Sequence, residues 1–307
     1  MHFCVFEDHD GHPRLGCATD AHRRRLVDLT AAWPGSAQPA PCDVGRLAAL
    51  GEQGLETARR LASEARDTLD VGELTLLAPI PRPRKNVFCV GRNYREHIIE
   101  GNIAQGRDPN AFPEHIELFT KAPTAVIGPE GPIPLHAELT SLLDYEAELA
   151  VIVGAGGSDL SEADARNAVF GYTIVNDVTA RDLQRRHGQW FKGKSLDGTC
   201  PMGPWVVHAS AMRDPHTLSI RLWVNDELRQ NGNTASMLFR VPDIVSRLSA
   251  GLTLEPGDVI ATGTPSGVGY AMKPPRPLKN GDVVAIEIEG IGRLVNTVRD
   301  LRHADGR

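Results

Sequence analysis

An acidic segment that leads into an apolar one constrains the fold of this chain more than any other feature. Asp144, Glu146 and Glu148 are separated by single residues, and the apolar run 149–153 follows them directly. Successive side chains of a β-strand point to opposite faces, so the three carboxylates would share one face of a strand that enters the interior. Buried carboxylates repel one another and lose hydration, which is costly unless a cation neutralises them. The segment therefore predicts either an edge strand whose acidic face meets water or a site for a hard divalent ion.

Composition and charge exclude several classes of protein. Of the 307 residues, 41% are apolar, which is enough for a full core, and the net charge of −6 argues against binding to nucleic acid. No apolar run approaches the ~20 residues that a membrane span needs, and Glu7 stands where a signal peptide would be basic or apolar. The five cysteines show no C-x-x-C spacing and are expected to be reduced thiols. We expect a soluble, cytoplasmic protein that binds neither nucleic acid nor membranes.

A proline-rich segment divides the chain. Residues 79–84 contain three prolines, which can neither continue a helix nor pair within a central strand, so we expect a stiff, extended linker there. Before it, the segments 3–6 and 15–19 flank a turn signal and predict a hairpin, and two short helices follow, the first of them capped by Asp43. We therefore expect a small N-terminal α/β domain over residues 1–78 and a larger domain over residues 79–307.

The larger domain is predicted to be rich in β-strands. Short apolar segments are separated by turns that contain Gly, Asp and Asn, and regular alternation of strands and helices is absent. A helix is expected over residues 161–170, where Ser161 can cap the first turn. The expected strands are residues 86–90, 125–127, 146–153, 172–176, 205–208, 218–224, 258–262, 283–288 and 293–298. This pattern favours a β-rich α+β fold, a mixed β-roll or distorted barrel with helices outside it, over a doubly wound sheet.

One motif match fails on inspection. Residues 188–195 fit the phosphate-loop pattern G-x-x-x-x-G-K-S, but that motif works only between a strand and a helix whose N-terminal amides hold the phosphates. Here residues 179–187 are expected to form a helix, and residues 196–204 contain two glycines and two prolines, which cannot begin one. We therefore do not expect a nucleotide site at this loop.

Polar residues also follow the ends of expected strands further along the chain. Asp177 is placed to complete an oxygen-only metal site with Glu146 and Glu148. Lys194 lies on a glycine-flanked loop, where a substrate could approach the backbone closely. The segment 262–269 offers backbone amides and hydroxyls for an oxyanion. Taken singly, these features also fit a helix cap, a solvated lysine and a tight turn.

Together, and in this order, these segments resemble the fumarylacetoacetate hydrolase family. The resemblance extends over about residues 85–298. It rests on five blocks of sequence, which are residues 90–94 with His97 and Glu100, residues 144–149, residues 176–182, residues 193–198 and residues 262–265. Residues before about Ala78 resemble the variable N-terminal domain of the bacterial branch, which includes acylpyruvases and 2-hydroxyhepta-2,4-diene-1,7-dioate isomerases.

The resemblance implies a divalent metal and a class of reaction. It places Mg²⁺ or Mn²⁺, with Ca²⁺ as a further choice, on Glu146, Glu148 and Asp177, usually within a homodimer. Members of the family act on small 2-oxo acids, often 1,3-dicarbonyls, by C–C hydrolysis, decarboxylation or tautomerisation. These reactions share an enolate or carbanion beside a carbonyl, which a chelated divalent ion stabilises as a Lewis acid.

The resemblance also assigns a catalytic pair, and the spacing of the two residues supports it. His97 and Glu100 are three residues apart, so on a helix their side chains share a face. A carboxylate can orient an imidazole and turn it into a general base for water. Without the resemblance, a surface histidine beside an incidental neighbour would be the default interpretation. The polar segment 95–115, which contains glycines and a proline, is expected to be a lid that orders over substrate.

We expect a metal-dependent hydrolase that cleaves a C–C bond in acylpyruvate-like 2,4-dioxo acids of aromatic catabolism, with His97, Glu100 and Lys194 as catalytic residues. The residues expected to bind substrate are Arg92, Tyr94, Lys121, Gln184 and Thr264. Oxaloacetate decarboxylation, or isomerisation of a catechol-pathway intermediate such as 2-hydroxyhepta-2,4-diene-1,7-dioate, is an alternative reaction at the same site. A non-catalytic metal-binding protein is a second alternative, against which the intact pair of His97 and Glu100 argues.

Overall fold

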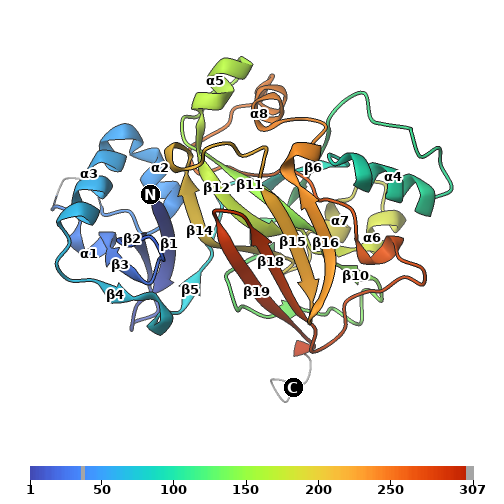
Figure 1. Cartoon of the computed structure of the whole chain (residues 1–307), viewed down its shortest axis with the longest axis horizontal. Helices are drawn as coiled ribbons and strands as arrows, with labels where there is room; N and C mark the ends of the chain where they lie inside the picture. The colour runs from blue at the N-terminus through green and yellow to red at the C-terminus, as the bar shows by residue number, and fades with distance from the viewer. Residues whose placement is uncertain (36–38, 302–307) are drawn as a thin grey trace.

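Two β-sheets dominate the computed structural model, which describes residues 1–35 and 39–301 (Figure 1). The larger sheet has twelve strands in the order β4-β3-β2-β1-β14-β12-β11-β17-β6-β7, with β5 beside β1 and β8 beside β14. Its strands are β1 (His2–Glu7), β2 (Pro13–Ala18), β3 (Arg25–Asp28), β4 (Leu69–Asp70), β5 (Leu76–Leu77), β6 (Val87–Gly91), β7 (Glu117–Lys121), β8 (Val126–Ile127), β11 (Ala147–Val153), β12 (Val169–Asn176), β14 (Cys200–His208) and β17 (Val259–Ala261).

The smaller sheet has five strands in the order β16-β15-β18-β19-β9, and β10 pairs with β13 alone. These strands are β9 (Ile133–Pro134), β10 (Leu143–Asp144), β13 (Thr179–Ala180), β15 (Ser219–Val224), β16 (Glu227–Asn233), β18 (Val283–Ile288) and β19 (Gly292–Arg299). The helices are α1 (Leu29–Ala32), α2 (Val44–Ala49), α3 (Gly51–Glu64), α4 (Arg95–Ala104), α5 (Glu162–Asn167), α6 (Arg181–Arg186), α7 (Phe191–Lys194) and α8 (Val241–Ser249). Among the described residues, no helix is both long enough and apolar enough to span a membrane.

Strand β11 explains why the molecule has two main cores. All seven of its residues are buried, and it lies between β12 and β17 within the larger sheet. Leu149 and Val151 pack into the core that β15, β18 and α8 also fill, whereas Ala150 and Ile152 pack with residues of β1 and α2. Alternate side chains thus enter different cores, as the period of a β-strand requires. A strand covered on both faces reads as a continuous apolar run, which is the pattern of residues 149–153.

The predicted N-terminal hairpin is present, but its strands belong to the larger sheet. Strands β1 and β2 pair antiparallel, and β1 also pairs with β14. Asp43 caps α2 as expected, because its side chain accepts a hydrogen bond from the amide of Arg46. Figure 1 shows α1, α2 and α3 gathered with β1–β4 at one end of the molecule. The division of the chain after residue 78 stays a prediction, since the hydrogen bonds of the sheet run across it.

The expected sheet-rich α+β class is confirmed, with changes at particular elements. The strands expected beyond residue 85 are present with shifts of up to five residues at their ends. Residues 169 and 170, expected at the end of a helix, begin β12 instead, because Val169, Phe170 and Tyr172 favour a strand buried against β11 and β14. Strands β7 and β16 were not expected, since polar residues interrupt their apolar pattern. The described strands do not close into a barrel, because the outer strands of each sheet pair with a neighbour on one side only.

Candidate active site

Three buried carboxylates meet where the start of β11 lies beside the end of β12. Ala147 pairs with Asn176 in these antiparallel strands, and the amide of Asp177 donates a 2.9 Å hydrogen bond to the carbonyl of Glu146. This pairing brings together residues that are about thirty positions apart in the sequence. Glu146, Glu148 and Asp177 each offer an oxygen within 4.8 Å of the other two, as the sequence predicts for a metal site.

Three basic side chains surround this carboxylate cluster. Nζ of Lys194 lies 2.7 Å from Oε2 of Glu146 and 2.6 Å from Oδ2 of Asp177. Nζ of Lys121 lies 2.8 Å from Oδ1 of Asp177, and Nη2 of Arg181 lies 2.7 Å from Oε1 of Glu146. All three cations are themselves buried. Neither Glu146 nor Asp177 is therefore an unpaired charge.

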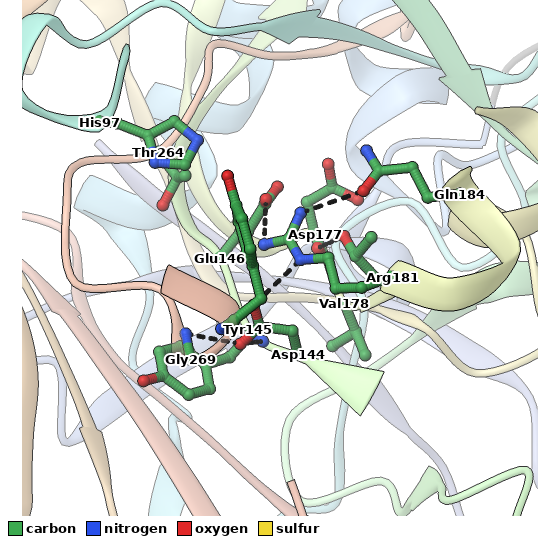
Figure 2. A network of polar contacts seen from close by, with 12 residues as sticks. His97, Asp144, Tyr145, Glu146, Asp177, Val178, Arg181, Gln184, Thr264 and Gly269 are labelled. Atoms are coloured by element: carbon green, nitrogen blue, oxygen red, sulfur yellow. Dashed lines mark hydrogen bonds and ion pairs between the residues drawn. The ribbon is translucent and has the colours of Figure 1, made fainter. Parts of the chain in front are cut away.

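Asp144, the first acid of the alternating segment, leaves the cluster and holds Arg181 instead. Its Oδ2 accepts a 2.9 Å hydrogen bond from Nε of Arg181. Backbone amides of Gly269 and Tyr270 also donate to its carboxylate, at 2.8 Å and 3.1 Å. Figure 2 shows the guanidinium of Arg181 between Asp144 and Glu146, with Gln184 on its outer side. The alternation predicted that Asp144, Glu146 and Glu148 share one face. Glu146 and Glu148 join the cluster, whereas Asp144 holds Arg181, one of the cations that pair with it.

The electrostatics single out Glu148. Burial tends to raise the pKa of Glu146, but Arg181 and Lys194 outweigh it and hold that pKa below its ordinary value. For Glu148, burial and the charges of Asp177 and Glu146 raise the pKa well above the ordinary value. The hydrogen bond that Glu148 accepts is from the amide of Gly263, at 2.7 Å. Glu148 has no basic side chain within 4.0 Å among the described residues.

The charge balance of this region fits a divalent cation. Four buried carboxylates, those of Asp144, Glu146, Glu148 and Asp177, face three buried cations. One negative charge is therefore left over, and it lies at Glu148, where oxygens of the three cluster residues converge. Oxygen-only ligand sets suit Mg²⁺ and Mn²⁺, and a bound divalent ion would allow Glu148 to ionise. Glu146, Glu148 and Asp177 would hold such an ion.

A glycine allows the backbone to support Glu148. Gly263 has a φ of +97°, in the region that favours glycine, and a Cβ there would lie 2.8 Å from Cβ of Asn93. Its amide can therefore reach the Glu148 carboxylate. Beside it, the Thr264 hydroxyl accepts a 2.8 Å hydrogen bond from Nε2 of Gln230, which fixes the threonine at the wall of the cavity.

The predicted catalytic pair is present on α4. Nδ1 of His97 lies 2.9 Å from Oε1 of Glu100, and both oxygens of Glu100 accept from the amide of Gly267, at 3.1 Å and 3.0 Å. Glu100 is thus fixed by the glycine loop after β17, and it fixes the imidazole in turn. Nε2 of His97 makes no hydrogen bond to the described residues and is available to a substrate. The segment expected as a lid therefore begins with a helix anchored next to the cluster.

A cavity of about 510 Å³ opens beside the cluster and His97, whereas Asp177 and Glu100 lie behind its lining residues. Helices α4, α6 and α7 each contribute residues to its wall, and Figure 1 shows them at the end of the molecule away from the N-terminal elements. The cavity is lined by a majority of the residues that the sequence indicates. They are Arg92, His97, Glu146, Glu148, Gln184, Lys194 and Thr264. Sequence segments separated by more than 150 positions therefore converge on one site.

Two of the residues expected to bind substrate lie away from the cavity. Tyr94 has no exposed surface, packs in the main core and does not line the cavity. Lys121 is also fully buried, and its Nζ donates a 2.9 Å hydrogen bond to the carbonyl of Val178 while pairing with Asp177. Lys121 therefore neutralises Asp177 from behind the cluster. Arg92 does line the cavity, but its guanidinium forms an ion pair with Glu117.

Sequence reasoning missed several residues of the cavity wall. Arg181 belongs to a quoted sequence block, but nothing in the sequence alone shows that its guanidinium is buried between two carboxylates. Others include Arg107, Arg185, Trp190 and Tyr270. The spacing of Arg181, Gln184 and Arg185 was an available signal, since residues three and four apart on a helix share a face.

Comparison with known proteins extends these findings. Residues 86–299 match the family described as fumarylacetoacetate (FAA) hydrolase C-terminal. An oxaloacetate tautomerase of Bacillus subtilis (strain 168) is 49% identical over 258 residues, which cover 81% of this chain and 84% of that protein.

Two solved structures show the same fold over nearly the whole chain. A fumarylacetoacetate hydrolase from psychrophilic Exiguobacterium antarcticum superposes with a TM-score of 0.82 and 44% identity, over 97% of this chain and 99% of that one. A maleylpyruvate hydrolase from a Sphingobium species, in complex with manganese(II) ion and pyruvate, superposes with a TM-score of 0.77 and 31% identity, over 97% and 99% of the two chains.

Proposed function

This chain belongs to the fumarylacetoacetate hydrolase family, and on that premise we propose that it is a metal-dependent isomerase that interconverts the keto and enol forms of oxaloacetate. The observation that carries the proposal is that His97 lines the same cavity as Glu146 and Glu148, two members of the carboxylate cluster that Asp177 completes. Tautomerisation moves a proton between C3 and the C2 oxygen, so it needs a proton carrier beside a stabilised enolate. It needs no nucleophilic water.

The proposed roles follow from the contacts of each side chain. A divalent ion on Glu146, Glu148 and Asp177 would supply a Lewis acid for the 2-oxo acid end of the substrate. His97 takes the C3 proton of the keto form at Nε2 and delivers it to the C2 oxygen to give the enol, and the reverse transfers give the keto form, while Glu100 keeps the ring in one orientation through Nδ1. Thr264, on the cavity wall, donates a hydrogen bond from its hydroxyl to the substrate carboxylate.

Lys194 serves as a fixed positive charge rather than as a proton carrier. Burial alone would lower its pKa, but Asp177 and Glu146 raise that pKa above the ordinary value of a lysine. Its ammonium group lies between those two carboxylates and lines the cavity. It therefore stays protonated and stabilises the enolate oxygen electrostatically.

Hydrolytic cleavage of a 2,4-dioxo acid is the second candidate reaction. Two solved relatives that cover nearly the whole chain carry hydrolase names, and His97 could equally activate water. The tautomerase relative has the higher sequence identity, and it favours isomerisation over the hydrolysis expected from the sequence. The same site can serve either reaction, so the product decides between them.

The test is to supply the Mg²⁺-loaded protein with enol-oxaloacetate and, separately, with acylpyruvates and fumarylpyruvate. Ultraviolet absorbance follows the enol, and mass spectrometry identifies products. We expect rapid relaxation of the enol to the keto–enol equilibrium with the mass unchanged, and little pyruvate from any substrate. Lys194→Met should abolish this activity, whereas Lys192→Met, an exposed neighbour on α7, should retain it. Efficient cleavage of an acylpyruvate, with enol relaxation at the buffer rate, would replace the proposal by hydrolysis.

A further inference from the structure

Most charged side chains of the cavity have a partner of opposite charge. Arg92 pairs with Glu117, and Arg181 and Lys194 pair with Glu146. Two arginines of the cavity wall differ. Neither Arg107 nor Arg185 has a carboxylate within 4.0 Å among the described residues, although both line the cavity and both are exposed to solvent. The outer part of the cavity therefore carries two positive charges that no protein group neutralises.

Arg185 is aligned with Arg181 at the floor of the cavity, which is the buried end where the carboxylate cluster and its basic partners lie. It follows Arg181 by four residues on α6, so the two side chains share a face of the helix. The ring of Tyr270 contacts both, with guanidinium carbons 4.5 Å (Arg181) and 5.6 Å (Arg185) from its centroid. Four helical residues rise about 6 Å, so Arg185 stands one turn further out than the arginine that binds Glu146. The stacking restricts the side chain without using its hydrogen-bond donors.

Arg107 lines the same cavity from a different segment of the chain. It follows α4, the helix that carries His97, and its backbone amide donates a 2.8 Å hydrogen bond to the carbonyl of Asn102. A ligand held at the carboxylate cluster would thus meet one unpaired arginine from α6 and another from the segment after α4. If such a ligand carries a second anionic group at its outer end, that group would meet positive charge that no protein carboxylate neutralises.

We propose that Arg185, assisted by Arg107, binds the distal carboxylate of the substrate, so that the enzyme selects 2-oxo dicarboxylic acids over 2-oxo monocarboxylic acids. The inference rests on the proposed function in one respect, namely that the 2-oxo acid end lies at the carboxylate cluster. A guanidinium offers two parallel donors that match a carboxylate, which favours this group over a neutral ketone or hydroxyl. Arg185 is a specificity residue, and the proton transfer does not depend on it.

The first test measures binding without turnover. Calorimetry compares malate with lactate on the Mg²⁺-loaded protein, because these 2-hydroxy acids differ by the distal carboxylate. The wild type should bind malate more tightly, by about 10–100-fold if Arg185 contributes one charged hydrogen-bonded pair. Arg185→Gln should remove this preference and leave lactate binding unchanged, and Arg185→Lys should restore part of it. Arg186→Gln is the matched control, since Arg186 is exposed on the same helix and does not line the cavity.

The second test uses the reaction. In Arg185→Gln, the KM for oxaloacetate should rise about 10–100-fold with kcat little changed, and solvent deuterium exchange at C3 of 2-oxobutanoate should stay as in the wild type. Arg107→Gln should raise the same KM by a smaller factor. An unchanged malate preference in Arg185→Gln would overturn the inference, as would an equal loss of malate and lactate binding. The wild type could be found inactive toward oxaloacetate and yet prefer malate, with that preference lost in Arg185→Gln. In that outcome the proposed function fails and this inference stands.

Discussion

The floor of the cavity and the N-terminal end of the larger sheet use charge in opposite ways. At the floor, seven charged side chains are buried. Near the N-terminus, both side chains of ion pairs such as Arg60–Glu64 on α3 are exposed to solvent, and the core there is apolar. Exposed pairs contribute little to stability, whereas buried pairs are often less stable than apolar residues of the same volume. Because apolar residues of the same volume would stabilise the fold at least as well, the buried charges at the floor of the cavity indicate a function.

The largest expected effect concerns the proposed metal ligands. Glu146→Ala and Asp177→Ala should each reduce activity to background and abolish Mn²⁺ binding in calorimetry, because each removes a ligand oxygen from the cluster. The N-terminal hairpin offers a matched control in Asp10, an exposed carboxylate that lies beside Asp8 and His9. Asp10→Ala should leave Mn²⁺ affinity unchanged. The comparison breaks if the affinity falls in Asp10→Ala and survives in the other two variants.

A smaller loss is expected when the proton carrier is removed and the cluster is left intact. His97→Ala should lower kcat for oxaloacetate tautomerisation by ~10²–10⁴-fold, the range that a positioned base contributes, with Mn²⁺ affinity retained. Glu100→Gln should cost less, because the imidazole remains while one of its anchors weakens. His22→Ala, at an exposed position near the N-terminus, serves as the control. Wild-type kcat in His97→Ala would remove this residue from the mechanism.

The third prediction sharpens the contrast in stability. Lys121→Met should lower the free energy of unfolding by about 3–5 kcal/mol in the metal-free protein, because Asp177 loses a buried partner. Arg60→Met on α3 should change it by less than ~1 kcal/mol, because that pair is solvated. Urea denaturation of both variants measures the difference. Equal losses of unfolding free energy in the two variants would show that burial does not decide how much an ion pair contributes to stability.

The smallest expected effect is a pH dependence at the junction of β1 and β14. Burial, with Arg23 next to His2 and the N-terminal amine next to His208, lowers the pKa of both histidines from 6.5 to about 4. The folded state thus binds fewer protons than the unfolded state, so stability is full above about pH 6.5 and falls as the pH drops toward 4. His208→Gln should flatten this decline between about pH 7 and pH 5. A denaturation midpoint with the same pH slope in variant and wild type would contradict it.

The cavity floor could be predicted from sequence where local rules apply. Strand alternation placed Glu146 and Glu148 together, and helical spacing paired His97 with Glu100. The remaining features depend on contacts between distant segments. Asp144 supports Arg181 because β10 pairs with β13, and Lys121 is buried because β7 ends behind Asp177. Tyr94 enters the core although its block of sequence borders the cavity. Local patterns carry no information on such long-range packing.

The most direct test of the account follows the proton itself. The Mg²⁺-loaded protein is incubated with oxaloacetate in deuterated buffer, and NMR measures deuterium at C3 together with the appearance of pyruvate. We predict that the protein incorporates deuterium far faster than buffer does, without matching pyruvate formation, and that His97→Ala removes the acceleration. Deuterium incorporation at the buffer rate, or pyruvate formed as fast as deuterium enters, would contradict a site built for keto–enol tautomerisation.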